Sequence, residues 1–493
     1  MHSHDARRPF VQQQKAMGMP PALEEAVDRQ DQRGAPSGDG SGRFEDGSSW
    51  RDPIFVIIFA VHWILLLVLV FVVRQNSEKA ADEEVEEDPE TGEERTTTSF
   101  SDTNSVVGSL VLCIFLACLW GIFWMFCMRK WPTGMIKAAL IAQVVCLLAF
   151  SIMSFAAGAV VGGVLFLLFA GLSAFIAYMM RHLIPFSAAL LKMSTELTQM
   201  YRSTIYLAFA GLGAMILYML FWSWACVTVS VRNGGGGAFV YLLFSMFWTT
   251  QVFKNIVHTS VSGCIGSWYF LSHTPHMPPS PLKGALKRSL TTSLGSIIFG
   301  SLLVATVKFI RFMVNQAMKH SNQEFIRCIC NCLLGMVERL VELFNLFAFT
   351  RVAIYGDAYI PAAKKTWAMV KERGIDMLWN DNLTGAVLWM GSLVGGVIVA
   401  IAAFIWTDAL IENDKLAEES RWILVLGALV VGIVLITVLL SPIESAIATV
   451  FVCYADEPET LRQANISYYT EISEALAHRR SGGTAQTQQN GRV

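Results

Sequence analysis

The sequence predicts an all-α polytopic membrane protein, a bundle of about ten transmembrane helices with one interfacial cytoplasmic helix. About ten long apolar stretches alternate with short polar connectors, and 54% of all residues are hydrophobic but only 15% charged. Most stretches run roughly 20 residues or more, which at about 1.5 Å per residue crosses a hydrocarbon core of about 30 Å. Lipid offers backbone amides no hydrogen-bond partner, so each span must be a helix. The predicted spans begin near Ile54, Val106, Met135, Gly158, Ile205, Phe239, Leu290, Asn322, Gly385 and Trp422.

Three parts of the chain differ in composition. Residues 1–50 are polar and rich in Gly, Ser, Gln and Asp. They contain no apolar core after a basic start, so they are not a cleaved signal peptide. We expect residues 1–50 and 477–493 to be disordered cytoplasmic tails, and residues 51–476 to form the transmembrane domain. The first span then acts as an uncleaved signal-anchor.

The distribution of Lys and Arg among the connectors predicts the orientation of the chain. The even-numbered connectors are basic, as in Arg129, Lys130 and Lys137, whereas the segment Ala81 to Arg95 after the first span is strongly acidic. The even connectors and both termini are therefore predicted to be cytoplasmic. The seventh connector disagrees, since it is also basic: either its side chains reach the outer headgroups, or the predicted boundaries are wrong there. Its basic residues are Lys308, Arg311, Lys319 and Arg327.

The eighth connector, Pro361 to Trp379, has an amphipathic pattern. Its apolar residues alternate with charges at roughly helical spacing, which predicts a helix in the cytoplasmic interface. A soluble loop helix packed on the bundle is an equal alternative. The apolar residues are Trp367, Val370, Ile375, Leu378 and Trp379.

Several classes of function find no support in the sequence. The net charge of -2 comes with no basic stripe of the kind that nucleic-acid binding requires. No metalloprotease, serine hydrolase or phosphate-loop motif occurs, so neither an enzyme nor a cofactor is predicted. Nearly all of the ten cysteines fall inside spans, where they act as small apolar packing residues. Cys328, Cys330 and Cys332 would be spread around a helix axis instead of converging on one metal.

The sixth span has a continuous polar side. Two adjacent helix faces carry it, because the polar residues recur at helical spacing. This side either lines a substrate path or forms hydrogen bonds between helices. A buried Lys254 ammonium needs a carboxylate partner, and Glu338 is the predicted one. The residues of the first face are Trp248, Gln251, Asn255 and Ser262, and those of the second are Thr250, Lys254 and His258.

Two other spans supply carboxylates. Glu338 and Glu342 stand four residues apart in the eighth span, beside Arg339. In the tenth span, Pro442 is expected to kink or break the helix next to Glu444 and to free a carbonyl group. Broken helices at membrane depth often form ion or substrate sites. The alternative is a static network of ion pairs.

Aromatic residues in the fifth and sixth spans could bind an organic cation. Their ring faces attract a quaternary ammonium by about 0.5 to 2 kcal/mol per contact. Tryptophan and tyrosine also collect at membrane interfaces, so each one has a structural explanation as well. The residues are Trp222, Trp224, Tyr241, Trp248, Trp268 and Tyr269.

Three sequence blocks resemble the choline transporter-like family: 247–270, 327–367 and 441–459. The resemblance extends from the first span to about Leu476 and implies the same ten spans with cytoplasmic termini. It looks closest to the fungal and protist branch, because the first connector is short. Glu444 also fits that branch, in its pattern S-x-I-[DE]-S, whereas many animal members have an Asp at the position of Ala448.

The resemblance implies a secondary transporter of the plasma membrane that moves choline or a related organic cation such as ethanolamine, with proton exchange. Residues 51–476 would then be the transporter domain. A carrier of another solute, or a membrane scaffold that does not transport, is the alternative. The sequence leaves the oligomeric state open. The predicted substrate-binding residues are Trp222, Tyr241, Trp248, Gln251, Asn255, Trp268, Glu338 and Glu444, and the predicted coupling or ion-pair residues are Lys254, His258 and Glu342.

Overall fold

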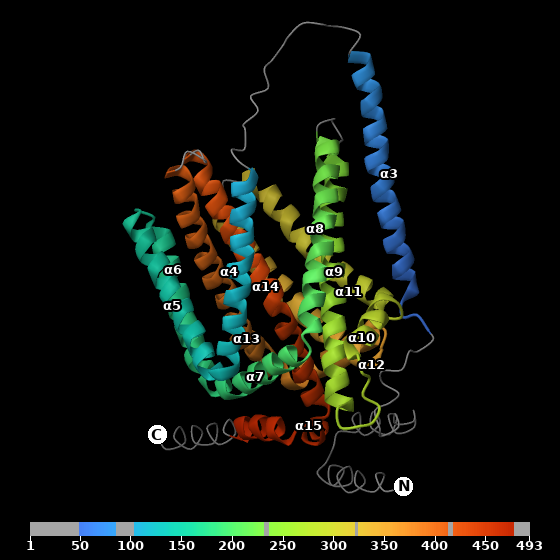
Figure 1. Cartoon of the computed structure of the whole chain (residues 1–493), viewed down its shortest axis with the longest axis vertical. Coiled ribbons are helices and arrows are strands. Elements are labelled where there is room, and N and C mark those ends of the chain that lie inside the picture. Colours follow the sequence, from blue (N-terminus) through green and yellow to red (C-terminus); the bar gives the residue numbers. More distant parts are fainter. Residues whose placement is uncertain (1–48, 85–102, 231–235, 321–323, 413–417, 478–493) are drawn as a thin grey trace.

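The structure is a computed structural model that describes residues 49–84, 103–230, 236–320, 324–412 and 418–477 (Figure 1). Regular structure in this part of the chain is helical. The helices are α3 (Pro53–Glu84), α4 (Thr103–Lys130), α5 (Pro132–Ala156), α6 (Val160–Met180), α7 (Ile184–Met200), α8 (Ser203–Ser230), α9 (Gly236–Leu271), α10 (Pro281–Leu290), α11 (Leu294–Ala317), α12 (Glu324–Tyr355), α13 (Tyr359–Glu412), α14 (Glu418–Asp456) and α15 (Pro458–Ala464). Two short 3-10 helices follow α6 and α11, and a last helix covers residues 466–477.

Nine helices of the described chain are long and apolar enough to cross a membrane. The eighth predicted span corresponds to α12, which is not one of these nine. It has 32 residues and carries Glu338, Arg339 and Glu342 within its apolar sequence. Side chains on the outside of the bundle, such as Val161 and Ile423, are apolar and exposed, as contact with lipid requires. The all-α polytopic fold class is therefore confirmed.

The helices pack around α9 and α14, which contact each other in the centre of the bundle. Helices α8, α11 and α12 pack on α9, and α4, α7 and α13 pack on α14. The hairpin of α5 and α6 forms one edge in Figure 1, and α3 forms the opposite edge. Helices α9 and α14 are therefore the elements that bring polar groups from both sides of the bundle together.

The segment 361–379 is helical, as predicted, and it is the first part of the continuous helix α13. The backbone N–H of Tyr359 donates to Oδ2 of Asp52, 2.9 Å away, so α13 begins beside the beginning of α3. The acidic residues 85–95 and the side chains of residues 373–379 lie outside the described part. The predicted cytoplasmic position of this segment stays a prediction.

Pro442 was expected to kink or break α14, and the break does not occur, because the helix is continuous through this residue. Proline has no N–H, so the carbonyl four residues earlier, that of Val438, loses its backbone donor. The Ser441 hydroxyl donates to this carbonyl at 2.9 Å. The freed carbonyl is thus satisfied by the neighbouring side chain.

Candidate functional site

Three ion pairs form a charged network between α11, α12 and α13. Its helices lie within the bundle, where charged side chains are costly unless they are paired. Lys308 Nζ lies 2.7 Å from Glu342 Oε1, Arg311 Nη1 lies 2.5 Å from Glu338 Oε2, and Arg339 Nη2 lies 2.5 Å from Asp381 Oδ2. Arg339 also approaches Glu342 to 4.0 Å, which joins the Arg339–Asp381 pair to the Lys308–Glu342 pair.

Helical spacing explains the first two pairs. Glu338 and Glu342 are one turn apart on α12, and Lys308 and Arg311 are one turn apart on α11. Because α11 and α12 pack against each other, the two turns meet. Lys308 and Arg311 lie inside α11 and pair with α12. The predicted boundaries of the seventh connector were therefore wrong at these two residues, which is one of the two explanations offered for them.

The predicted pair of Lys254 and Glu338 is not formed. Glu338 pairs with Arg311, and Lys254 has an exposed side chain without an ion pair among the described residues. Lys254 still lies within electrostatic range of Glu342 and His258. The prediction was wrong because Arg311 is the partner of Glu338, and residue spacing within one span carries no information on which neighbouring helix supplies a partner.

Glu444 on α14 lies within electrostatic range of Asp381. Its side chain is half-buried, and no hydrogen bond or ion pair joins it to another described residue. Two carboxylates thus lie near each other at the junction of α13 and α14, and only Asp381 has a cation, Arg339, beside it. The sequence prediction missed Asp381 because it precedes the apolar run from Gly385 and resembles a connector residue.

His258 connects α9 to both α12 and α14. Its Nδ1 lies 2.9 Å from the Ser445 hydroxyl, and its Nε2 lies 2.9 Å from the Leu346 carbonyl oxygen. A carbonyl only accepts, so Nε2 carries a proton, and in the neutral ring Nδ1 accepts from Ser445. The buried His258 side chain therefore joins α9 to α12 and to the residue of α14 that follows Glu444.

The other polar face of α9 packs on α11. Asn255 Nδ2 donates to the Ser301 hydroxyl at 2.8 Å, and Trp248 Nε1 donates to the Ile298 carbonyl at 3.3 Å. Gln251 is buried in the same face. These contacts are helix-to-helix hydrogen bonds, the structural explanation that the sequence left open for this face.

The aromatic candidates lie in three different places. The Tyr241 hydroxyl donates to the His62 carbonyl oxygen at 2.9 Å and lies 2.8 Å from His62 Nδ1. The His62 ring centroid is 4.9 Å from that of Trp248. Trp222 donates to the backbone of α9, and Trp268 packs edge-on against Tyr468 near the C-terminal end of α9. These residues do not form one ring, and their role in binding a substrate stays a prediction.

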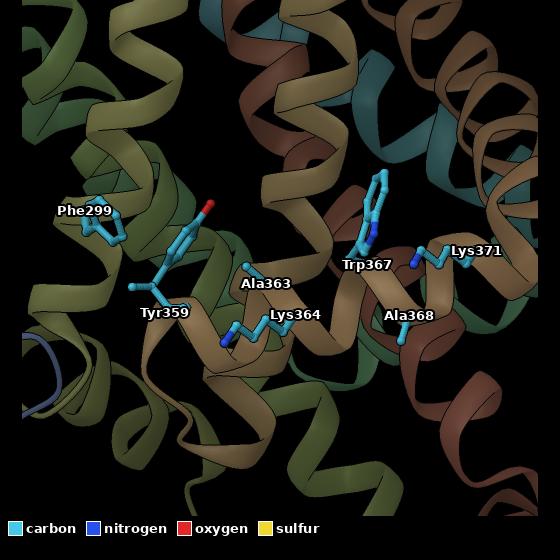
Figure 2. A pocket seen from close by; sticks show the side chains of 8 residues that line it. Phe299, Tyr359, Ala363, Lys364, Trp367, Ala368 and Lys371 are labelled. Atoms are coloured by element: carbon cyan, nitrogen blue, oxygen red, sulfur yellow. The ribbon is translucent and has the colours of Figure 1, made fainter. Parts of the chain in front are cut away.

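Two cavities lie outside the charged network. One, of about 560 Å³, is a groove between α11 and the first part of α13 (Figure 2). The other, of about 180 Å³, lies near Arg51 and Ser289 at the beginning of α3 and the end of α10. Neither is lined by Glu338 or Glu444. The described residues contain no group of three His, Cys, Asp or Glu side chains placed to hold a metal ion.

Comparisons with known proteins agree with the resemblance seen in the sequence. The family described as "Plasma-membrane choline transporter" matches residues 164–459, more than half of the chain. Protein pns1 of Aspergillus fumigatus is 32% identical over 328 residues, which are 61% of this chain and 61% of that protein. Protein PNS1 of Mycosarcoma maydis is 27% identical over 461 residues, 89% of this chain and 85% of that protein. A CTL-like protein of Dictyostelium discoideum is 30% identical over 346 residues, 68% of this chain and 60% of that protein.

The matched residues 164–459 run from α6 to α15 and include every helix of the charged network. The match to the Aspergillus relative covers less than two thirds of that protein. The extent of the family match gives the classification. The chain belongs to the plasma-membrane choline transporter family.

Proposed function

We propose that this protein is a secondary transporter of the plasma membrane that carries choline or a related organic cation, and that Glu444 and Asp381 provide the negative charge for it. Family membership supports a transporter, and the pairing pattern of the network supports a cationic substrate. A quaternary ammonium cannot donate hydrogen bonds, so its recognition needs a nearby carboxylate or ring faces.

The observation that carries the proposal is the state of Glu444. The other three acids, Glu338, Glu342 and Asp381, each pair with a Lys or Arg, but Glu444 has no such partner among the described residues. An unpaired carboxylate in a bundle interior is costly and is typically kept for a function. A bound ammonium would supply the missing countercharge.

Proton exchange would involve the groups beside Glu444. Arrival of a cation at the carboxylate favours loss of a proton from a nearby acidic group. His258 is hydrogen-bonded to Ser445, the residue after Glu444 in α14, and Lys254 lies within electrostatic range of His258. We therefore place the coupling between substrate and proton at Glu444, with His258 as the group that connects it to α9.

Uptake of labelled choline into vesicles that contain the purified full chain tests the proposal. We expect uptake that exceeds that of protein-free vesicles, is reduced by unlabelled ethanolamine, and changes with an imposed pH gradient. Uptake that equals the protein-free control would refute choline transport. Uptake that is insensitive to the pH gradient would refute proton exchange but leave the cation site standing.

A further inference from the structure

A groove of about 560 Å³ lies between α11 and the first part of α13, outside the charged network (Figure 2). Its volume falls in the range of about 300–1,000 Å³ that small-molecule sites occupy. Apolar side chains form most of its wall, and two lysines lie at its edge. The lining residues are Phe299 on α11 and Tyr359, Ile360, Ala363, Lys364, Trp367, Ala368 and Lys371 on α13.

One face of α13 supplies most of the groove. Ile360, Lys364, Trp367 and Lys371 follow each other at steps of four, three and four residues, so they lie on the same side of the helix. Ile360 is 53% exposed and Trp367 is 55% exposed. Large apolar side chains on this face are therefore exposed at the surface of the protein.

The two lysines of this face are not neutralised within the protein. Lys364 and Lys371 are exposed and form no ion pair with a described residue. Lys365, between them in sequence, lies on another side of the helix and pairs with Asp357 at 2.7 Å. Lys371 Nζ stays 5.9 Å from the centre of the Trp367 ring. The groove thus combines an apolar wall with two free positive charges.

The groove lies at one end of the membrane-spanning helices. It begins at the first turn of α13, which is held beside the start of α3 by Asp52, and it includes Phe299 from the second turn of α11. Tryptophan and lysine are typical of the level where headgroups meet hydrocarbon. Basic pockets between helices on the cytoplasmic side are suited to anionic headgroups.

We propose that this groove binds one anionic phospholipid, with an acyl chain against Phe299, Ile360 and Trp367 and the phosphate between Lys364 and Lys371. The apolar wall would contact the acyl chain of the lipid, and the two lysine ammonium groups would bind its negatively charged phosphate. A free phosphate would use the lysines but leave the apolar wall uncovered. The groove is separate from Glu444, so the proposal of a lipid site does not depend on choline transport.

The charge of the site is tested by native mass spectrometry of the purified full chain with phosphatidylserine or phosphatidylcholine. The test variant is Lys364→Gln with Lys371→Gln, and the charge-matched control is Lys137→Gln with Lys365→Gln. We expect the wild type and the control to retain phosphatidylserine in preference to phosphatidylcholine. The test variant should lose about tenfold in phosphatidylserine binding. An equal loss in both double variants, or no preference in the wild type, would overturn the proposal.

The apolar wall is tested with phosphatidylserine whose acyl chains carry bromine, which quenches nearby tryptophan fluorescence. Trp367→Phe should remove a distinct part of this quenching. Trp389→Phe is the matched control, because Trp389 lies on the exposed surface of the span in α13. Glycerophosphoserine, which has the headgroup without chains, should not displace the lipid. Displacement by this headgroup, the same quenching in Trp367→Phe as in the wild type, or a dimer that depends on Trp367 would contradict a lipid site.

Discussion

Arg339 Nη2 and Asp381 Oδ2 lie 2.5 Å apart and join the middle of α12 to α13. The same arginine approaches Glu342, which is paired with Lys308. Asp381 lies within electrostatic range of Glu444 on α14. Arg339 is thus placed between paired and unpaired carboxylates. A substrate cation at Glu444 would change the electrostatic balance of this pair directly.

Removal of either member of the Arg339–Asp381 pair should destabilise the protein. The sum of these two losses should exceed the loss in the double variant. Arg339→Met leaves Asp381 without its cation, and Asp381→Asn leaves Arg339 without its anion. We expect a coupling energy of about 0.5–3 kcal/mol from the two single variants and the double variant. Thermal unfolding of purified protein in detergent measures it.

The pair of Arg462 and Glu459, whose side chains are 61% and 66% exposed, is the control for this cycle. A pair of this kind contributes only about 0–1 kcal/mol. Additive effects of Arg339→Met and Asp381→Asn, with no more coupling than in the control pair, would show that the contact contributes nothing.

Exchange of the charges of Lys308 and Glu342 should restore what each single change removes. Lys308→Glu places two carboxylates together, and Glu342→Lys places two ammonium groups together, so both should reduce the yield of folded protein. The double variant recreates an ion pair with reversed direction. Recovery of the monodisperse peak in size-exclusion chromatography is the expected result, and a double variant as poor as the worse single variant would argue against the pair.

Ser441→Ala should destabilise α14 only while Pro442 is present. The Ser441 hydroxyl is the donor to the Val438 carbonyl, and its loss inside the membrane should cost about 0.6–2 kcal/mol. Pro442→Ala restores a backbone N–H for the same carbonyl, so Ser441→Ala should then have little effect. Thermal unfolding of the four proteins decides it: an equal cost of Ser441→Ala in both backgrounds would mean that another group satisfies Val438.

The last helix, 466–477, should detach from α7 at alkaline pH. Burial, and then the hydrogen bond that Tyr468 donates to Glu196, raise the pKa of the Tyr468 phenol above its usual value. The stability from this group is complete below about pH 10 and is lost as pH rises through the raised pKa of the folded state. Hydrogen exchange of residues 466–477 should accelerate in that range, and Tyr468→Phe should remove this step. A Tyr468→Phe protein with the same alkaline step would assign it to another group.

The spans could be predicted from the sequence because membrane insertion depends on local hydrophobicity and length. Helix α12 was predicted as a helix, but its three charged residues set it apart from the nine helices apolar enough to span. The helical state of residues 361–379 followed from the same periodicity. Hydropathy does not indicate that this segment continues into the next span as one helix, because that depends on the backbone conformation between them.

The partners of the charged residues could not be predicted in the same way. The spacing of Trp248, Gln251 and Asn255 placed them correctly on one face, but the helix opposite that face is set by the rotation of α9 in the bundle. For the same reason Lys254 was assigned to Glu338, although Arg311 is the partner. The role of Ser441 beside Pro442 depends on a rotamer, which no sequence pattern fixes.

The most direct test of the account is choline uptake by vesicles that contain Glu444→Gln protein. Glu459→Gln is the matched control, because it removes the same charge from the exposed surface of α15. We predict that Glu444→Gln lowers uptake at subsaturating choline by at least about tenfold and abolishes its pH dependence, while Glu459→Gln transports like the wild type. Glu444→Gln protein that is folded and inserted at the wild-type level, and that takes up choline at the wild-type rate, would contradict the account.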